Sequence, residues 1–90
     1  MAQVFIPALL RVETEGREWV EATGGTVREV VVCLEGRYPG LKGRLVKEGR
    51  LVAGLAVAID GEISSMGLAE EVGAETEVQF LTAISGGIAP

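Results

Sequence analysis

The 90-residue sequence contains no histidine, and Cys33 is its single cysteine. Without histidine, neither a Ser-His-Asp nor a Cys-His catalytic set can be assembled from this chain, and a zinc site built from cysteine and histidine is nearly excluded. A lone cysteine cannot form an internal disulfide, as expected of a protein in a reducing cytoplasm. The sequence therefore argues against an enzyme that supplies its own catalytic residues or binds its own metal.

Positive charge is scarce, because eight lysines and arginines stand against 13 aspartates and glutamates, for a net charge of −5. The basic residues are scattered along the sequence. Nucleic acid is therefore not an expected partner, since phosphate binding needs a concentrated positive face. A protein partner with a positively charged surface fits the net charge better.

No apolar run approaches the ~20 residues of a membrane span. The first residues have neither a basic n-region nor a long apolar core, so we expect no signal peptide and no membrane partner. Hydrophobic residues nevertheless make up 48% of the sequence. The length suits one small domain with a modest core, so we expect a folded, cytoplasmic and non-catalytic domain.

The first part of the sequence predicts a hairpin. Residues 3–10 are rich in β-branched and aromatic side chains and predict a strand, with Pro7 at an edge or bulge. Residues 14–16 are turn-like, and residues 17–22 predict a second strand that pairs with the first.

A helix is predicted over residues 26–38. The motif TVRE at 26–29 is a capping box, in which the Thr26 hydroxyl accepts a hydrogen bond from the Glu29 N–H and the Glu29 carboxylate reaches back. Apolar residues then recur at helical spacing, and Pro-Gly at 39–40 ends the helix. The apolar positions are Val27, Val30, Val31, Leu34 and Tyr38.

The second part of the sequence predicts three more strands. Residues 41–49 are basic and loop-like, with room for a helical turn at 41–46, and residues 51–59 are apolar throughout, as in a strand buried on both faces. Asp-Gly at 60–61 is a tight-turn signal before a short strand at 62–64. After loops and a short helical turn at 68–72, the last strand covers residues 77–84.

The last predicted strand is followed by Ser85, Gly86 and Gly87, and then by Ile-Ala-Pro. Two adjacent glycines place no side chains in a narrow channel and accept backbone angles that are closed to other residues. A chain whose own carboxylate must enter another enzyme's active site needs these properties. A frayed glycine-rich end is the alternative explanation.

The order of these elements and the Gly-Gly ending resemble the ubiquitin-like β-grasp fold and, more narrowly, the ThiS/MoaD family of small sulfur carriers. The segments that carry the resemblance are 26–29, 34–35, 38–41, 59–62 and 78–87. The resemblance implies an α+β domain over residues 1–84, with a mixed sheet of four or five strands packed on one main helix. Residues 85–90 would form a flexible tail.

The resemblance also implies that Gly87 is the reacting residue. An E1-like adenylyltransferase would use ATP and magnesium to adenylate its carboxylate, and a persulfide would convert it to a thiocarboxylate for a sulfur-accepting biosynthetic enzyme. Here, however, Ile88 follows and locks the Gly87 carbonyl in a peptide bond. We therefore expect a JAMM-type peptidase to cut between Gly87 and Ile88, with a drifted tail or lost carrier activity as the alternative.

Alternation along the last strand places Val78 and Phe80 in the core and Leu81 toward a partner, with a buried Leu81 as the alternative. The predicted docking residues are Leu81, Phe80 and Ile84. Two other functions remain open: a protein modifier joined through Gly87 to lysines of a target protein, and a β-grasp interaction module without terminal chemistry. A variant of the carrier would dock its tail permanently in a larger subunit.

Overall fold

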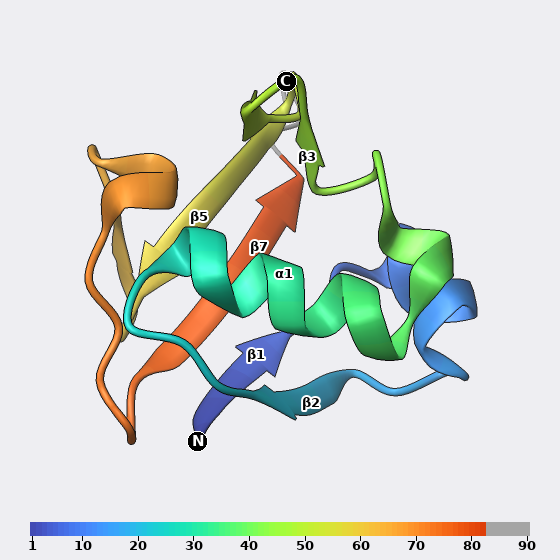
Figure 1. Cartoon of the computed structure of the whole chain (residues 1–90), viewed down its shortest axis with the longest axis horizontal. Coiled ribbons are helices and arrows are strands. Elements are labelled where there is room, and N and C mark those ends of the chain that lie inside the picture. The colour runs from blue at the N-terminus through green and yellow to red at the C-terminus, as the bar shows by residue number, and fades with distance from the viewer. Residues whose placement is uncertain (83–90) are drawn as a thin grey trace.

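The computed structural model describes residues 1–82, in which one main helix lies across a five-stranded sheet (Figure 1). The helix, α1, spans Val27–Arg37. The strands are β1 (Ala2–Phe5), β2 (Trp19–Ala22), β3 (Val46–Lys47), β4 (Arg50–Leu51), β5 (Leu55–Ile59), β6 (Glu62–Ile63) and β7 (Glu77–Thr82). The connections contain the 3-10 helices η1 (Ala8–Thr14), η2 (Pro39–Leu41) and η3 (Gly67–Ala69).

The five-stranded sheet has the strand order β2-β1-β7-β5-β6, and β3 and β4 form a separate two-stranded ribbon. β1 and β7 are parallel at the centre, whereas β2, β5 and β6 pair antiparallel with their neighbours. The register places Val4 of β1 opposite both Val20 and Val78. The α+β class with a mixed sheet on one helix is therefore confirmed, while the predicted domain boundary at residue 84 falls outside the described residues.

Helix α1 begins at the predicted capping box. The Glu29 N–H donates to the Thr26 hydroxyl oxygen at 3.3 Å, and the Glu29 carboxylate accepts from the Gly25 N–H at 2.7 Å. Gly24 has a φ of +154°, and a β-carbon at this position would lie 2.7 Å from the Val30 backbone nitrogen. A glycine is thus needed where the loop from β2 passes against the first turn of the helix.

Replacing Thr26 with alanine removes the side-chain acceptor at the helix start. We expect a loss of about 1 kcal/mol in the free energy of unfolding, because the Glu29 N–H loses its partner. Thr23→Ala is the matched control, since Thr23 lies on the same loop and its hydroxyl makes only a 3.8 Å contact with the Cys33 sulfur. Urea unfolding of the two variants measures the difference, and equal losses would show that the cap is energetically silent.

The core lies between α1 and one face of the sheet. Four of the five predicted helix positions are buried, namely Val27, Val30, Val31 and Leu34, while Tyr38 is half-buried at the end of the helix. They pack against alternate residues of the strands, because successive strand side chains point to opposite faces. The buried strand residues in this core include Val4, Val20, Val57, Val78 and Phe80.

The first predicted strand is too long, because β1 ends at Phe5 and residues 8–14 form η1. Pro7 lies at the change, with φ −59° and ψ 150°, and has no N–H to continue a ladder. Its carbonyl instead accepts the Leu10 N–H at 2.9 Å, which starts the 3-10 helix. The strand therefore ends before Pro7 despite the strand propensity of residues 3–10, because Pro7 has no N–H donor.

The predicted strand over 51–59 is wrong in its first part. Residue 51 belongs to the β3–β4 ribbon, and β5 begins only at Leu55, after Gly54 with φ 83°. The prediction of burial on both faces holds only at the centre of β5, where the consecutive residues Val57 and Ala58 point to opposite faces and are both buried. The other residues of this strand are only half-buried.

The region 41–49, predicted as a loop, contains β3. Val46 and Lys47 pair with Leu51 and Arg50 around a two-residue turn in which both residues have positive φ. This is the geometry of a type I′ hairpin. The predicted helical turns at 41–46 and 68–72 appear shifted toward the N-terminus, as η2 and η3.

Candidate functional site

Strand β7 leads the chain to the predicted reacting residue. β1 pairs with it as far as Gln79, and β5 pairs with it to the end, where Leu55 lies opposite Thr82. Gly87 follows Thr82 by five residues, so it cannot be more than about 18 Å from the end of the strand. The predicted site residues Ile84, Ser85, Gly86, Gly87 and Ile88 lie outside the described residues.

The two described docking residues lie on opposite faces of β7. Phe80 is 0% exposed and belongs to the core, so its side chain has no surface to offer a docking partner. Its place in the docking set is therefore corrected, while its predicted place in the core agrees with the structure. Leu81 is half-buried and its register partner is Ala56, on the sheet face away from α1.

One row across that outer sheet face is apolar except for Gln79 on the central strand β7. Across the strands, this row consists of Trp19, Phe5, Gln79, Ala58 and Ile63, each paired with the next. The rings of Phe5 and Trp19 meet edge to face with centroids 5.2 Å apart. Leu81 lies on the same face, two residues along β7 from this row. The row itself was not predicted as a site, because its members are spread singly over five strands and no local sequence pattern joins them.

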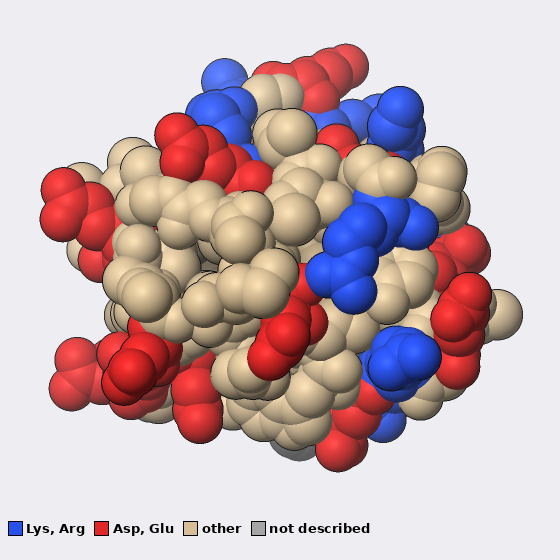
Figure 2. Space-filling model, turned by 60° about the horizontal axis from the view of Figure 1, so that its bottom comes forward, with Lys and Arg blue, Asp and Glu red and all other residues tan. Residues whose placement is uncertain are grey.

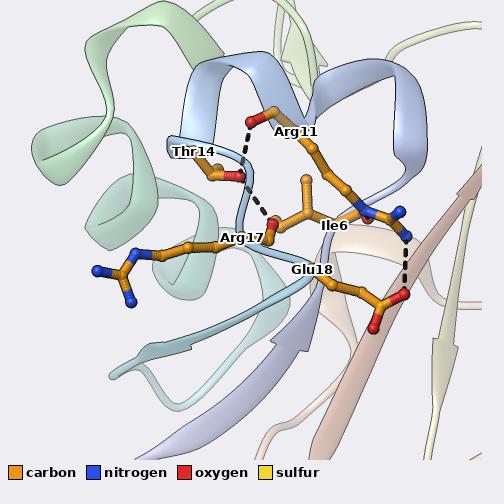
Figure 3. A network of polar contacts seen from close by, with 5 residues as sticks. All are labelled: Ile6, Arg11, Thr14, Arg17 and Glu18. Carbon is orange, nitrogen blue, oxygen red and sulfur yellow. Dashed lines mark hydrogen bonds and ion pairs between the residues drawn. The ribbon is translucent and has the colours of Figure 1, made fainter.

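A polar network closes the β1–β2 edge of this face (Figure 3). The buried Thr14 hydroxyl donates to the Arg17 carbonyl at 2.9 Å. Arg11 donates through Nε to the Ile6 carbonyl at 2.9 Å and pairs with the Glu18 carboxylate at 3.3 Å. These contacts tie η1 to the start of β2 and hold the Arg11 guanidinium 5.2 Å from the Phe5 ring centroid.

A hollow of about 490 Å³ with acidic lining residues lies at the β5–β6 turn. Two of its lining side chains, Asp60 and Ser64, already make hydrogen bonds within the protein. Asp60 accepts from the Glu77 N–H at 2.9 Å, and Ser64 donates to Glu70 at 2.6 Å. In residues 1–82, no three histidine, cysteine, aspartate or glutamate side chains are grouped to hold a metal ion. The same part of the chain has no helix with the length and apolar character to cross a membrane.

Comparison with known proteins places the chain in one family. Residues 4–87 match the model of the ThiS family. The sulfur carrier protein CysO of Mycobacterium tuberculosis is 34% identical over 89 residues, which cover 93% of this chain and 96% of that protein.

Solved structures agree with this match. A chain in the crystal structure of the Amycolatopsis orientalis BexX/CysO complex has a TM-score of 0.88 and 38% identity, covering 97% of this chain and all of that one. The small archaeal modifier protein 1 of Methanosarcina acetivorans has a TM-score of 0.80 and 25% identity, with 96% and 95% covered. The ubiquitin-like β-grasp prediction is confirmed, and the chain belongs to the ThiS family.

Proposed function

We propose that this chain is a small sulfur carrier rather than an enzyme, and that Gly87 carries the sulfur as a thiocarboxylate. The observation that carries this proposal is the family match, which runs to Gly87 and leaves residues 88–90 outside it. The relatives named sulfur carrier protein CysO, 34% identical over 93% of this chain, support the same role. The reacting group would then lie a few residues beyond the central strand β7.

Residues 1–82 would provide the surface to which partner enzymes bind. Its helix-facing side is filled by the core, so a partner that takes the tail has the outer sheet face available beside β7. Leu81 lies on that face, near the point where the chain leaves the sheet, and Phe5 and Trp19 extend it across β1 and β2. Aromatic and aliphatic side chains of this kind commonly anchor protein interfaces.

Activation has to solve one chemical problem. A carboxylate is a poor electrophile, because its leaving group would be oxide. An E1-like partner would hold ATP and magnesium and let a Gly87 carboxylate oxygen attack the α-phosphorus. Pyrophosphate leaves, and the resulting acyl adenylate carries AMP as a good leaving group.

The sulfur step would follow on the same carbonyl carbon. The outer sulfur of a partner's persulfide attacks, AMP leaves, and an acyl disulfide links Gly87 to the partner. A second thiol then cleaves that S–S bond, forming a disulfide on the donor side and releasing the thiocarboxylate. Its sulfur is a better nucleophile than oxygen near neutral pH, so it can pass to a sulfur-accepting biosynthetic enzyme.

Processing would have to precede both steps, because the Gly87 carbonyl is in a peptide bond with Ile88. A JAMM-type zinc peptidase is the proposed partner. Its metal-bound water would attack the Gly87 carbonyl carbon, which no side chain shields. The cut releases Ile-Ala-Pro and exposes the carboxylate.

A second candidate is supported by the similarity to small archaeal modifier protein 1 from two organisms, Methanosarcina acetivorans and Haloferax volcanii. A modifier would use the same adenylated Gly87, but a lysine amine of a target protein would attack instead of a persulfide. The product would be an isopeptide bond. The two functions therefore share activation and differ in the acceptor.

Intact-mass analysis of the protein isolated from its own cells distinguishes these candidates. We expect a species that ends at Gly87, part of it with one oxygen replaced by sulfur. A recombinant chain that stops at Gly87, made without the partners, is the mass standard for the unmodified form. Larger conjugates without any thiocarboxylate would favour the modifier, and a chain found only with residues 88–90 attached would contradict both.

A further inference from the structure

Opposite charges separate along the sequence and in the fold. Four of the eight basic residues fall within residues 42–50, and none follows Arg50. Residues 60–77 hold six acidic residues and no basic one, namely Asp60, Glu62, Glu70, Glu71, Glu75 and Glu77. In Figure 2 the charged side chains on the left side of the molecule are acidic, whereas the basic ones lie toward its top and right, among further acidic ones.

Two of these acidic residues lie where β7 begins. Glu77 is the first residue of β7, and Asp60 is bonded to it through both its backbone N–H and its carboxylate, each at 2.9 Å. The six residues of β7 then carry the chain away from this end by about 17 Å. The site residues follow at the far end of the strand.

The β3–β4 ribbon, which carries Lys47 and Arg50 of the basic group, lies beside that far end (Figure 1). Thr82 pairs with Leu55, whose N–H donates to the Val52 carbonyl at 3.0 Å. Val52 directly follows the β3–β4 ribbon and donates to the Leu45 carbonyl at 2.9 Å. The ribbon that carries Lys47 and Arg50 is therefore fixed next to the point where β7 ends.

A hollow of about 320 Å³ joins this ribbon to the first turn of α1 and to η3. Its apolar lining consists of the buried Leu68, the half-buried Leu51 and Met66, which is 60% exposed. The exposed residues Arg28 and Arg50 also line it, and the Arg28 guanidinium donates to the Gly49 carbonyl at 3.4 Å. We call this surface the Arg28/Arg50 groove.

Neither arginine of the groove has an acidic partner among residues 1–82, where the ion pairs join Arg11 to Glu18 and Arg44 to Glu13. An apolar lining with two arginines that make no ion pair within residues 1–82 fits a segment that brings carboxylates beside an apolar side chain. We propose that the enzyme that receives the tail docks an acidic segment into the Arg28/Arg50 groove. This inference rests on the proposed function, since it assigns a surface to the partner that acts on Gly87.

The net charge of −5 favours a positively charged partner. The partner's acidic segment, however, interacts mainly with the charges closest to the groove. The Debye length is about 8 Å at physiological salt, and Asp60 and Glu77 are about 17 Å from the end of β7. Screening therefore weakens the repulsion that Asp60 and Glu77 exert at the end of β7. Glu70 is nearer to the groove, because Ala69 lines it and the Val27 N–H donates to the Glu70 carbonyl, but the Glu70 carboxylate accepts the Ser64 hydroxyl at 2.6 Å.

The test uses the chain ending at Gly87 and the E1-like enzyme encoded in the same genome, assayed by ATP–pyrophosphate exchange. Arg28→Glu with Arg50→Glu should raise the KM for the carrier about tenfold at low salt, with kcat nearly unchanged, because docking is affected and the reacting carboxylate is not. The difference should shrink at about 0.5 M salt.

Both substitutions suit the fold locally, so unfolding does not explain a change. Residue 28 is the second residue of α1, where an acidic side chain favours the helix dipole, and residue 50 lies opposite Lys47 in the ribbon. Arg17→Glu is the matched control for each single variant, because it makes the same change in charge on an exposed residue next to β2, at the opposite edge of the sheet.

The two single variants are measured beside the double variant. A KM unchanged in the double variant, or raised by Arg17→Glu as much as by either single groove variant, overturns the groove proposal while leaving the carrier function intact. If the unsubstituted chain ending at Gly87 is not activated at all, the proposed function fails and this inference fails with it. The two failures are distinguished by that one measurement on the unsubstituted chain.

Discussion

The uncut 90-residue chain is expected to be inert in pyrophosphate exchange with its E1-like enzyme, whereas a chain that ends at Gly87 is expected to be active. In the uncut chain the only backbone carboxylate is that of Pro90, up to about 10 Å further along the tail. A misplacement of even about 1 Å can cost about 100-fold in rate. We therefore expect at least about a 100-fold difference between the two chains, measured with the same enzyme and ATP.

Substitution of Gly86 tests whether the tail must be narrow for the E1-like enzyme to adenylate Gly87. In the chain ending at Gly87, Gly86→Val should reduce exchange to background, because a β-branched side chain widens the tail and restricts its backbone angles. Ser85→Ala is the matched control, since it changes the neighbouring residue without adding bulk, and it should keep most of the activity. Equal activation of cut and uncut chains would contradict the need for processing, and an active Gly86→Val chain would contradict a narrow channel.

Helix α1 could be predicted because its signals are local. The cap, the apolar spacing and the Pro-Gly stop lie within one short stretch, and the structure places the helix within one residue of the predicted ends. The β5–β6 turn was equally readable from Asp60-Gly61, since this pair favours positive φ at both positions, which the structure shows.

The β3–β4 ribbon could not be read in the same way. Its turn residues are Glu48 and Gly49, and both have positive φ, yet glutamate carries no preference for that conformation. The ribbon forms because its tertiary setting holds it, with Leu45 bonded to Val52 and Leu51 packed on the core. Local propensity therefore does not predict the β3–β4 ribbon, which flanks the end of β7.

The candidate site also has a part that local sequence predicts and a part that it does not. Alternation along one strand was enough to assign Phe80 to the core and Leu81 to the other face. The outer row from Trp19 to Ile63 and the Arg28/Arg50 groove each collect residues from distant parts of the chain. Net charge misses the groove for a related reason, because a sum over the chain contains no information about where the charges lie.

Replacing Leu34 with alanine should have a large effect on stability. Leu34 is 0% exposed on α1 and belongs to the core shared with the sheet. Its truncation removes buried apolar contacts and leaves a cavity, for an expected loss of ~2–4 kcal/mol in the free energy of unfolding. For a domain of this size, that corresponds to a fall in Tm on the order of 10–30 °C.

Val32→Ala is the control on the same helix, because Val32 is 63% exposed and alanine has the higher helix propensity. Its free energy of unfolding should stay within about 0.5 kcal/mol of the unsubstituted chain, or rise slightly. Differential scanning calorimetry and urea unfolding measure both variants. A loss below about 0.5 kcal/mol for Leu34→Ala would mean that this face of α1 does not bury against the sheet, and the packing described above would be wrong. A large loss in the free energy of unfolding for Leu34→Ala alone would show that the domain depends on this face of α1 for its stability. The position of β7, from which the tail extends, depends on the same packing.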